Sequence, residues 1–186
     1  SFIYIPLMLV VINSFNKNKS FNWPPTGFTT TWWTKAASNP GVKDAIFLSV
    51  LTATFATVIA LILGSLAAAA IARYSFFGRD VISLIFVLPI ALPGIVTGIA
   101  LNNVFTNFFG GLTFFTIIIG HATFCVVVVF NNVAARYRRM GSSFEEASMD
   151  LGANRITTFR LVTFPMIRNA LVAGGLLSFG LSFDEI

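Results

Sequence analysis

Charged residues are scarce in this chain of 186 residues, because Asp, Glu, Lys and Arg make up only 10% of it while 56% is apolar. A typical soluble domain has about 25% charged residues. The stretch from Val81 to Ala135 contains no charged residue over 55 positions. This composition excludes a soluble globular protein. It predicts an all-α, polytopic membrane protein.

Cysteine and histidine are almost absent, since Cys125 and His121 are the only residues of their kinds. A single cysteine excludes an intrachain disulfide framework, and one residue of each kind gives no metal-ligand cluster, so neither a metal nor a cofactor is expected. Cys125 is interpreted as a small packing residue. For His121 we expect a hydrogen bond between helices rather than a proton relay, because the uncharged run holds no carboxylate to exchange protons with.

Sequence features of enzymes and of nucleic-acid binding are missing as well. No G-x4-G-K-[ST] segment is present to cradle phosphates, so ATP hydrolysis is not expected in this chain. An intramembrane hydrolase would need a nucleophile beside its base, and one histidine without a nearby carboxylate does not provide that pair. The basic residues responsible for the net charge of +5 lie between apolar runs, which is typical of topology signals rather than of a nucleic-acid surface.

Five membrane spans are predicted from the gaps between charged residues, because a span needs about 20 apolar residues. They form one transmembrane domain over residues 1–186 and cover about 2–12, 45–72, 81–101, 112–135 and 167–183. The first and last spans look incomplete, so both ends of the chain are expected to be truncated. The polar segment 13–44 is then an outer loop, and residues 136–166 form a loop on the opposite side.

Small residues and helix breakers distinguish two of these spans. In the second span, Ala60, Gly64, Ala68 and Ala72 recur at every fourth position, which predicts a helix face that a neighbouring helix can approach closely. The third span contains Pro93 and Gly94, so its helix is expected to be kinked or broken and to lie beside the translocation path. Between the third and fourth spans, three asparagines and a glycine pair predict a turn; they are Asn102, Asn103, Asn107, Gly110 and Gly111.

Basic residues are distributed unevenly between the two sides of the membrane. Eight arginines lie around 73–80 and in or next to 136–166, whereas the four lysines lie in the outer loop or next to it. The positive-inside rule therefore places the loops at 73–80 and 136–166 in the cytoplasm.

The cytoplasmic loop contains the most informative motif. Ser143 and Glu146 have the spacing of a capping box, so a short helix is expected to begin there, with Gly152 as its stop. Phe144, Ala147 and Leu151 would share one face of that helix. A second amphipathic segment is expected to run to Pro165, where the chain turns into the last span. From the pattern alone, an ordinary amphipathic connector on the membrane surface explains these residues equally well.

A family resemblance favours a more specific interpretation. The motif reads Glu146-Ala147-Ser148, three residues, Gly152-Ala153, five residues, Phe159, two residues, Val162, one residue, Phe164-Pro165. It resembles the EAA loop of the permease subunits of ATP-binding cassette (ABC) importers, E-A-A-x3-G-A-x5-F-x2-I-x-L-P. Ser148, Val162 and Phe164 depart from the motif but keep size or apolarity. Residues 88–101 and 182–186 are similar to spermidine/putrescine-type permeases.

The resemblance implies a MetI-like transmembrane domain with the type I ABC importer permease fold, in the inner membrane of a prokaryote. It also implies a second permease subunit, two ATP-binding cassette subunits that bind the ATP, an extracytoplasmic solute-binding protein, and lipid around the spans. The implied ATPase-coupling residues are Glu146, Ala147, Ser148, Gly152, Ala153, Phe159 and Pro165. A polyamine-like solute is expected.

Two other classes of membrane protein remain as alternatives. A secondary transporter or channel subunit would use an ion gradient or passive flow, and buried coupling charges would support it; none precedes Asp184. A structural membrane anchor would require neither the interrupted third span nor the cytoplasmic helix.

Two adjacent acids complete the candidate substrate path, together with Pro93 and Gly94. From Ile167 to Asp184 a helix rises about 26 Å, which nearly crosses a hydrocarbon core of roughly 30 Å. Asp184 and Glu185 are therefore expected near the outer interface, where they face either a polar cavity that attracts a cation or a basic residue of the partner permease. The sequence leaves these two possibilities open.

The predicted orientation can be tested by labelling a cysteine introduced at Ser142 in a Cys125→Ala background. Because the loop at 136–166 is predicted to be cytoplasmic, an impermeant thiol reagent should label this cysteine in inverted vesicles but not in intact cells. Labelling from outside intact cells would refute the orientation, and with it the coupling role of the loop.

Overall fold

The computed structural model describes residue 2 and residues 4–20, 23–91 and 94–184. Within these residues the secondary structure is helical, apart from turns and one isolated bridge between Asn16 and Phe28. The chain divides into two compact units, residues 1–48 and 49–186, and each is described by itself.

The first unit is organised around Asn16. It contains helices α1 (Tyr4–Ser14) and α2 (Thr31–Ser38), the second of which was not predicted, and the start of α3 (Pro40–Arg73). The Asn16 side chain is fully buried and its Oδ1 accepts hydrogen bonds from the backbone N–H of Asn18 and the hydroxyl of Thr26. The Trp32 indole N–H donates to the Asn16 carbonyl at 3.0 Å. The predicted outer loop is therefore a folded segment.

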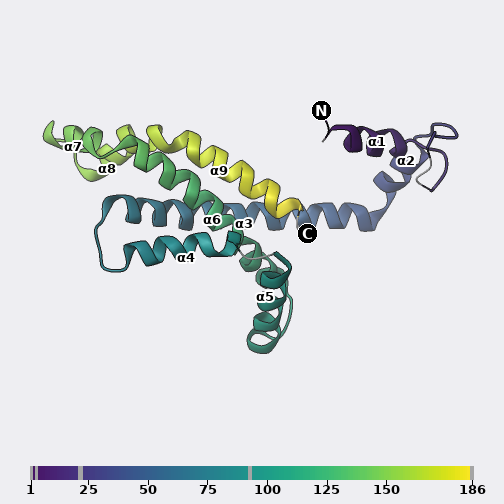
Figure 1. The fold of residues 1–186 in the computed structure, drawn as a ribbon, viewed down its shortest axis with the longest axis horizontal. Coiled ribbons are helices and arrows are strands. Elements are labelled where there is room, and N and C mark those ends of the chain that lie inside the picture. The colour runs from purple at the N-terminus through teal and green to yellow at the C-terminus, as the bar shows by residue number, and fades with distance from the viewer. Residues whose placement is uncertain (1, 3, 21–22, 92–93, 185–186) are drawn as a thin grey trace. The chain divides into compact units, whose positions relative to one another are not determined.

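The second unit contains the remainder of α3 and seven further helical segments (Figure 1). Their bounds are α4 Arg79–Ala91, α5 Gly94–Phe109, α6 Phe114–Met140, α7 Ser143–Asp150, α8 Arg155–Thr158, the π-helix η1 Phe159–Thr163 and α9 Phe164–Asp184. Among the described residues, three helical stretches are long and apolar enough to cross a membrane: Pro40–Arg73, Phe114–Met140 and Arg155–Asp184. Shorter apolar helices cover Tyr4–Ser14 and Ile95–Phe109.

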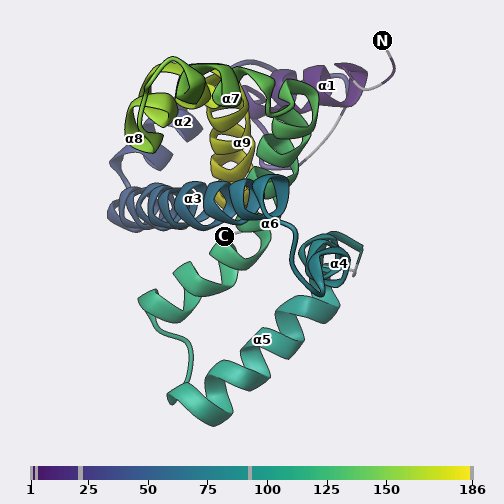
Figure 2. The same cartoon turned by 90° about the vertical axis from the view of Figure 1, so that its left-hand side faces the viewer.

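The predicted third span corresponds to two helices. Helix α4 ends at Ala91 and α5 begins at Gly94, and Figure 2 shows α5 running in a different direction from α4. This agrees with the predicted interruption, although Pro93 itself lies outside the described residues. The turn predicted at the asparagines is wrong, because α5 continues through them to Phe109. Gly110 and Gly111, with φ of 78° and 118°, make the turn without the asparagines.

The expected turn at Pro165 is also wrong, because the helical stretch continues from Arg155 through the proline to Asp184. Proline lacks an N–H and its ring clashes with the carbonyl four residues earlier in a regular helix. Here a wider π-helical turn precedes it, and the Phe164 N–H donates to the carbonyl of Phe159, five residues back. This turn accommodates the proline without ending the helix.

Helix α6 is in contact with both α3 and α9 at Val129. Gly64 of α3 is so close that a Cβ atom there would lie 2.8 Å from the Val126 carbonyl oxygen and 2.9 Å from Val129 Cβ. Gly174 of α9 approaches the same residue, with 3.3 Å from its hypothetical Cβ to Val129 Cα. Val129 and Ala60 are fully buried. The predicted close-packing face of the second span is thus confirmed.

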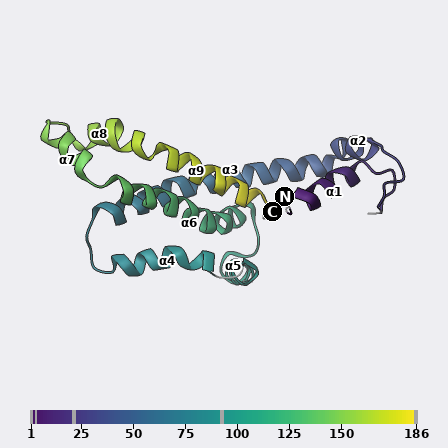
Figure 3. The same cartoon turned by 45° about the horizontal axis from the view of Figure 1, so that its top comes forward.

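Polar side chains also join α6 to α9, and the two helices lie side by side (Figures 1 and 3). His121 Nδ1 is 3.0 Å from the Ser182 hydroxyl, which confirms the expected hydrogen bond between helices. Deeper in the contact, the Ser178 hydroxyl donates to the Cys125 carbonyl at 3.2 Å, and the Cys125 thiol donates to the Ser178 carbonyl at 3.4 Å. Cys125 is buried, as expected of a packing residue.

The contact at Gly64 predicts the effect of one added methyl group. Gly64→Ala places a Cβ against backbone that cannot move freely, so it should lower the free energy of unfolding by about 1–3 kcal/mol. The matched control is Gly98→Ala in α5, where nothing lies within 4 Å of the added Cβ. Denaturant-induced unfolding of the full-length permease in detergent measures both variants, and equal midpoints for the two would contradict the packing described here.

Candidate functional site

Helix α7 lies in the cytoplasmic loop predicted from the sequence. The predicted capping box between Ser143 and Glu146 is wrong, because the N-cap is Ser142 and its side chain makes no capping hydrogen bond. The backbone N–H groups of Glu145 and Glu146 both donate to the Ser142 carbonyl at 3.0 Å. In a capping box that starts at Ser142, the side chain three residues later, Glu145, would accept a hydrogen bond from the Ser142 backbone N–H. Its carboxylate instead binds two other elements of the fold.

Glycine ends this helix, as predicted. Gly152 has a φ of 90°, a conformation that other residues rarely adopt. Its N–H donates to the Met149 carbonyl at 2.9 Å, and the Ala153 N–H donates to the Ser148 carbonyl at 3.2 Å. These two bonds are those of a Schellman motif, which fixes the direction in which the chain leaves the helix.

The inward face of α7 is polar and is bound to the rest of the second unit. Glu145 Oε2 lies 2.8 Å from Arg73 Nε at the end of α3, and Glu145 Oε1 accepts a hydrogen bond of 2.7 Å from the Thr163 hydroxyl. Ser148, one turn further along α7, is 3.2 Å from the Thr158 hydroxyl. Glu145 and Ser148 are three positions apart in α7 and so lie on the same side of the helix.

The outward face of α7 is apolar and exposed. Phe144 is 57% exposed and Leu151 is 90% exposed, and Ala147 and Glu146 on the same helix are also exposed. An amphipathic helix normally buries its apolar side and exposes its polar side. Phe144 and Leu151 do the reverse within this chain, which is the pattern of a surface that another protein or a membrane covers.

The remaining residues of the predicted motif lie beyond α7. Asn154 caps α8, since its side-chain Oδ1 accepts the Thr157 N–H at 2.8 Å. Phe159 is half exposed in η1, with its ring centroid 6.3 Å from that of Phe164, and Pro165 is exposed on α9. Ala153 is half-buried between the two short helices. The structure thus brings the motif together at one end of α6 and α9 (Figure 3).

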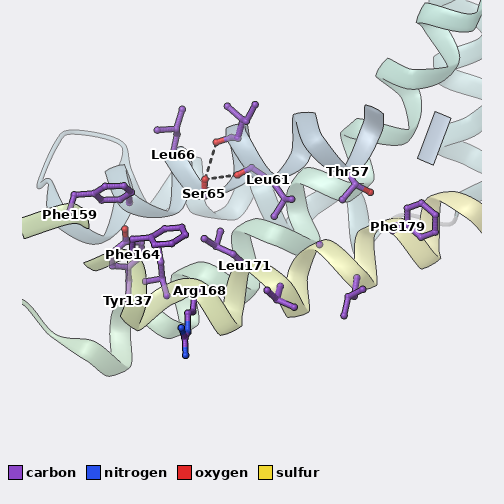
Figure 4. A pocket seen from close by; sticks show the side chains of 16 residues that line it. Thr57, Leu61, Ser65, Leu66, Tyr137, Phe159, Phe164, Arg168, Leu171 and Phe179 are labelled. Carbon is purple, nitrogen blue, oxygen red and sulfur yellow. Dashed lines mark hydrogen bonds between the residues drawn. The ribbon is translucent and has the colours of Figure 1, made fainter. Parts of the chain in front are cut away.

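An apolar groove of about 750 Å³ lies between α3 and α9, close to this motif. Figure 4 shows Leu61 and Leu171 lining it, and Phe159 and Phe164 at one end. Arg168 is the charged residue of its lining. A multiply charged cation would lose its hydration in such a groove without gaining carboxylate partners. The groove therefore does not have the chemistry of a path for a polyamine.

The candidate substrate-path residues are only partly described. Pro93 and Glu185 lie outside the described residues, and Gly94 is the first residue of α5. Asp184 is exposed and ends α9, two residues after Ser182, which is bound to His121 of α6. The structure therefore places Asp184 within one turn of the contact between α6 and α9.

Sequence reasoning missed the residues that hold α7 in place. Arg73 was counted only among the arginines that indicate topology, and Glu145 was assigned no role. The ring of Tyr137 in α6 lies under Arg73, with 5.0 Å from the guanidinium carbon to the ring centroid. No local pattern identifies this group, because its members come from four different elements and Arg73 lies 72 residues before Glu145.

Comparison with known proteins shows which family this chain matches. Residues 60–186 match the model of the family described as binding-protein-dependent transport system inner membrane component. The chain is 34% identical over its whole length to the spermidine/putrescine transport system permease protein PotC of Haemophilus influenzae, and covers 72% of that protein. It is 33% identical to the putrescine transport system permease protein PotI of Escherichia coli K12, and covers 68% of it.

Another relative is named for a different solute. The sulfate transport system permease protein CysT of Salmonella typhimurium is 32% identical over 80% of this chain, which covers 58% of CysT. Among solved structures, a bacterial ABC transporter involved in the import of the acidic polysaccharide alginate matches 95% of the chain with a TM-score of 0.60 at 20% identity. The chain spans 64% of that transporter chain, and this likeness shows the fold alone.

Proposed function

We propose that this chain, which belongs to the family of binding-protein-dependent transport system inner membrane components, is the permease subunit of an ATP-driven importer. It is a multi-pass inner-membrane protein whose spans form part of a translocation path for a small solute. Relatives are transport permeases rather than enzymes, so we place ATP hydrolysis on separate subunits. The family gives no support to the alternatives of an ion-coupled transporter or a channel.

The exposed apolar face of α7 is the observation that supports the coupling role. We assign this face to docking against an ATP-binding cassette subunit, with Phe144, Ala147 and Leu151 as its apolar contacts and Glu146 beside them. A short, rigid helix can enter a groove of a partner and pass a rigid-body movement to the helices that it joins. The proposed assembly contains two permeases, two ATPase subunits and an extracytoplasmic solute-binding protein.

For the solute we propose a polyamine-like organic cation. Two relatives that match the whole chain carry polyamine names, and Asp184 adds a carboxylate at the end of α9 that is expected to lie near the outer interface. The name of CysT shows that the family also contains a sulfate permease. The solute is therefore a narrower proposal than the permease function and needs its own test.

The docking role predicts the effect of substitutions at Gly152. Gly152→Arg forces a side chain into a positive-φ position and puts a long cation beside the docking face, so the amount of copurifying ATPase and the rate of uptake should fall roughly tenfold or more, which corresponds to about 1.4 kcal/mol. The amount of permease in the membrane should not change.

Gly152→Asn serves as the matched control, because asparagine tolerates this backbone conformation better than other residues and adds no charge. It should retain most of the ATPase association. Normal association and normal uptake in Gly152→Arg would show that α7 does not dock as proposed.

The solute proposal predicts the effect of removing the acids at the end of α9. In full-length permease, Asp184→Asn together with Glu185→Gln should raise the KM for spermidine and putrescine uptake by about twofold to tenfold, since cation attraction would be lost. Asp44→Asn, at an exposed acid near the start of α3, is the control. Unchanged uptake with normal assembly excludes the attracting role, whereas loss of uptake together with loss of the second permease favours a salt bridge to that partner.

A further inference from the structure

Four elements of the second unit meet at one charged group beside α7. Arg73 is the last residue of α3, Tyr137 belongs to α6, Glu145 to α7 and Thr163 to η1. Both oxygens of the Glu145 carboxylate are engaged, one 2.8 Å from Arg73 Nε and the other 2.7 Å from the Thr163 hydroxyl. The Arg73 guanidinium also lies over the Tyr137 ring. Each of these elements contains or joins a helix long enough to span the membrane.

Burial makes this pair different from an ordinary surface ion pair. The Arg73 and Glu145 side chains are only 20% and 15% exposed. Solvent and salt screen such a pair less than they screen an exposed one, and the hydrogen bond from Thr163 and the ring of Tyr137 help to hold its two members in place. Among the residues that the structure describes, it is the one ion pair.

The backbone fixes the turn after α7 through two hydrogen bonds at its end, but the Ser142 side chain makes no capping hydrogen bond at the start of the helix. Gly141, with a φ of 70°, precedes the helix and Gly152, with a φ of 90°, follows it. A Cβ at either glycine would have nothing within 4 Å, so both glycines border open space. The orientation of α7 relative to the spans therefore depends on its inward side chains, Glu145 and Ser148.

We infer that Glu145 and Arg73 are positioning residues that transmit the movement of α7 to the membrane spans. This inference rests on the proposed docking of α7 against an ATPase subunit. When the docked helix moves, the Glu145 carboxylate pulls on Arg73 and so moves α3. The same carboxylate pulls on Thr163 and so moves the helical stretch that continues as α9. Without the carboxylate, α7 still docks, but it rotates at the turn around Gly141 and less of the movement reaches the spans.

The experiment uses the complete importer, with both permeases, the ATPase subunits and the solute-binding protein, reconstituted in proteoliposomes. Spermidine uptake and ATP hydrolysis are measured together for the wild type, Glu145→Gln, Arg73→Gln and the double variant. Each single change should lower the spermidine transported per ATP by roughly threefold or more, while ATPase copurification stays at the wild-type level. The double variant should be no worse than either single variant, because the two residues act through one another.

Matched controls separate this role from a general loss of charge or stability. Arg79→Gln and Asp80→Asn remove the same charges from exposed positions at the start of α4. They should leave the ratio of spermidine transported to ATP hydrolysed unchanged. Arg73→Lys keeps the charge and should restore most of the ratio. If the glutamine variants do not assemble, Glu145→Asp, which shortens the reach by one methylene group, should lower the ratio in assembled importer.

Three results would overturn the inference. One is a wild-type ratio in assembled Glu145→Gln or Glu145→Asp, with only the yield or thermal midpoint lowered, because the pair would then be merely structural. Another is additive losses in the double variant. A wild-type permease that neither copurifies with an ATPase nor supports spermidine uptake would instead refute the proposed function, and the inference would fall with it.

Discussion

The close approach of three helices at Val129 is the constraint on which the rest of the second unit depends. Gly64 of α3 and Gly174 of α9 reach this fully buried residue of α6 from two sides. In lipid no hydrophobic driving force favours contact between apolar helices over contact with acyl chains, so association relies on close packing and on hydrogen bonds. The two glycines allow the close packing, and Ser178 and Ser182 form the hydrogen bonds between α6 and α9. Both are needed to hold α6 and α9 in register.

This register determines the arrangement of side chains around α7. Arg73, Tyr137 and Thr163 belong to different helical elements, and they reach Glu145 only because those elements are held against one another. The exposed face of α7 is thus positioned by contacts deep in the membrane-spanning bundle. The docking surface that we propose could then transmit force in both directions, since the same contacts that orient the helix would also receive its displacement.

The structural features that were predicted correctly are those that depend on residues close together in the sequence. The charge gaps located the long apolar helices, the four-residue repeat of small side chains identified the face at Ala60 and Gly64, and Gly152 was identified as a helix stop. The errors have a common cause, since each concerns a choice between alternatives that local sequence leaves nearly equal. Asparagines stay in α5 although they favour turns, and Pro165 stays in a helix because a π-helical turn precedes it.

The ion pair at Glu145 could not have been predicted, and the failed capping box shows why. Ser142 and Glu145 have the spacing of such a box, yet the carboxylate binds Arg73 and Thr163, from segments 72 and 18 residues away. A capping interaction at an exposed helix start contributes about 1 kcal/mol, and a partly buried charge with two partners contributes more than that. Tertiary contacts therefore determine where this carboxylate lies. Polar contacts within the chain satisfy the inner face of α7 and leave its apolar residues exposed, and this division of faces is the reason why we propose the helix as the docking element.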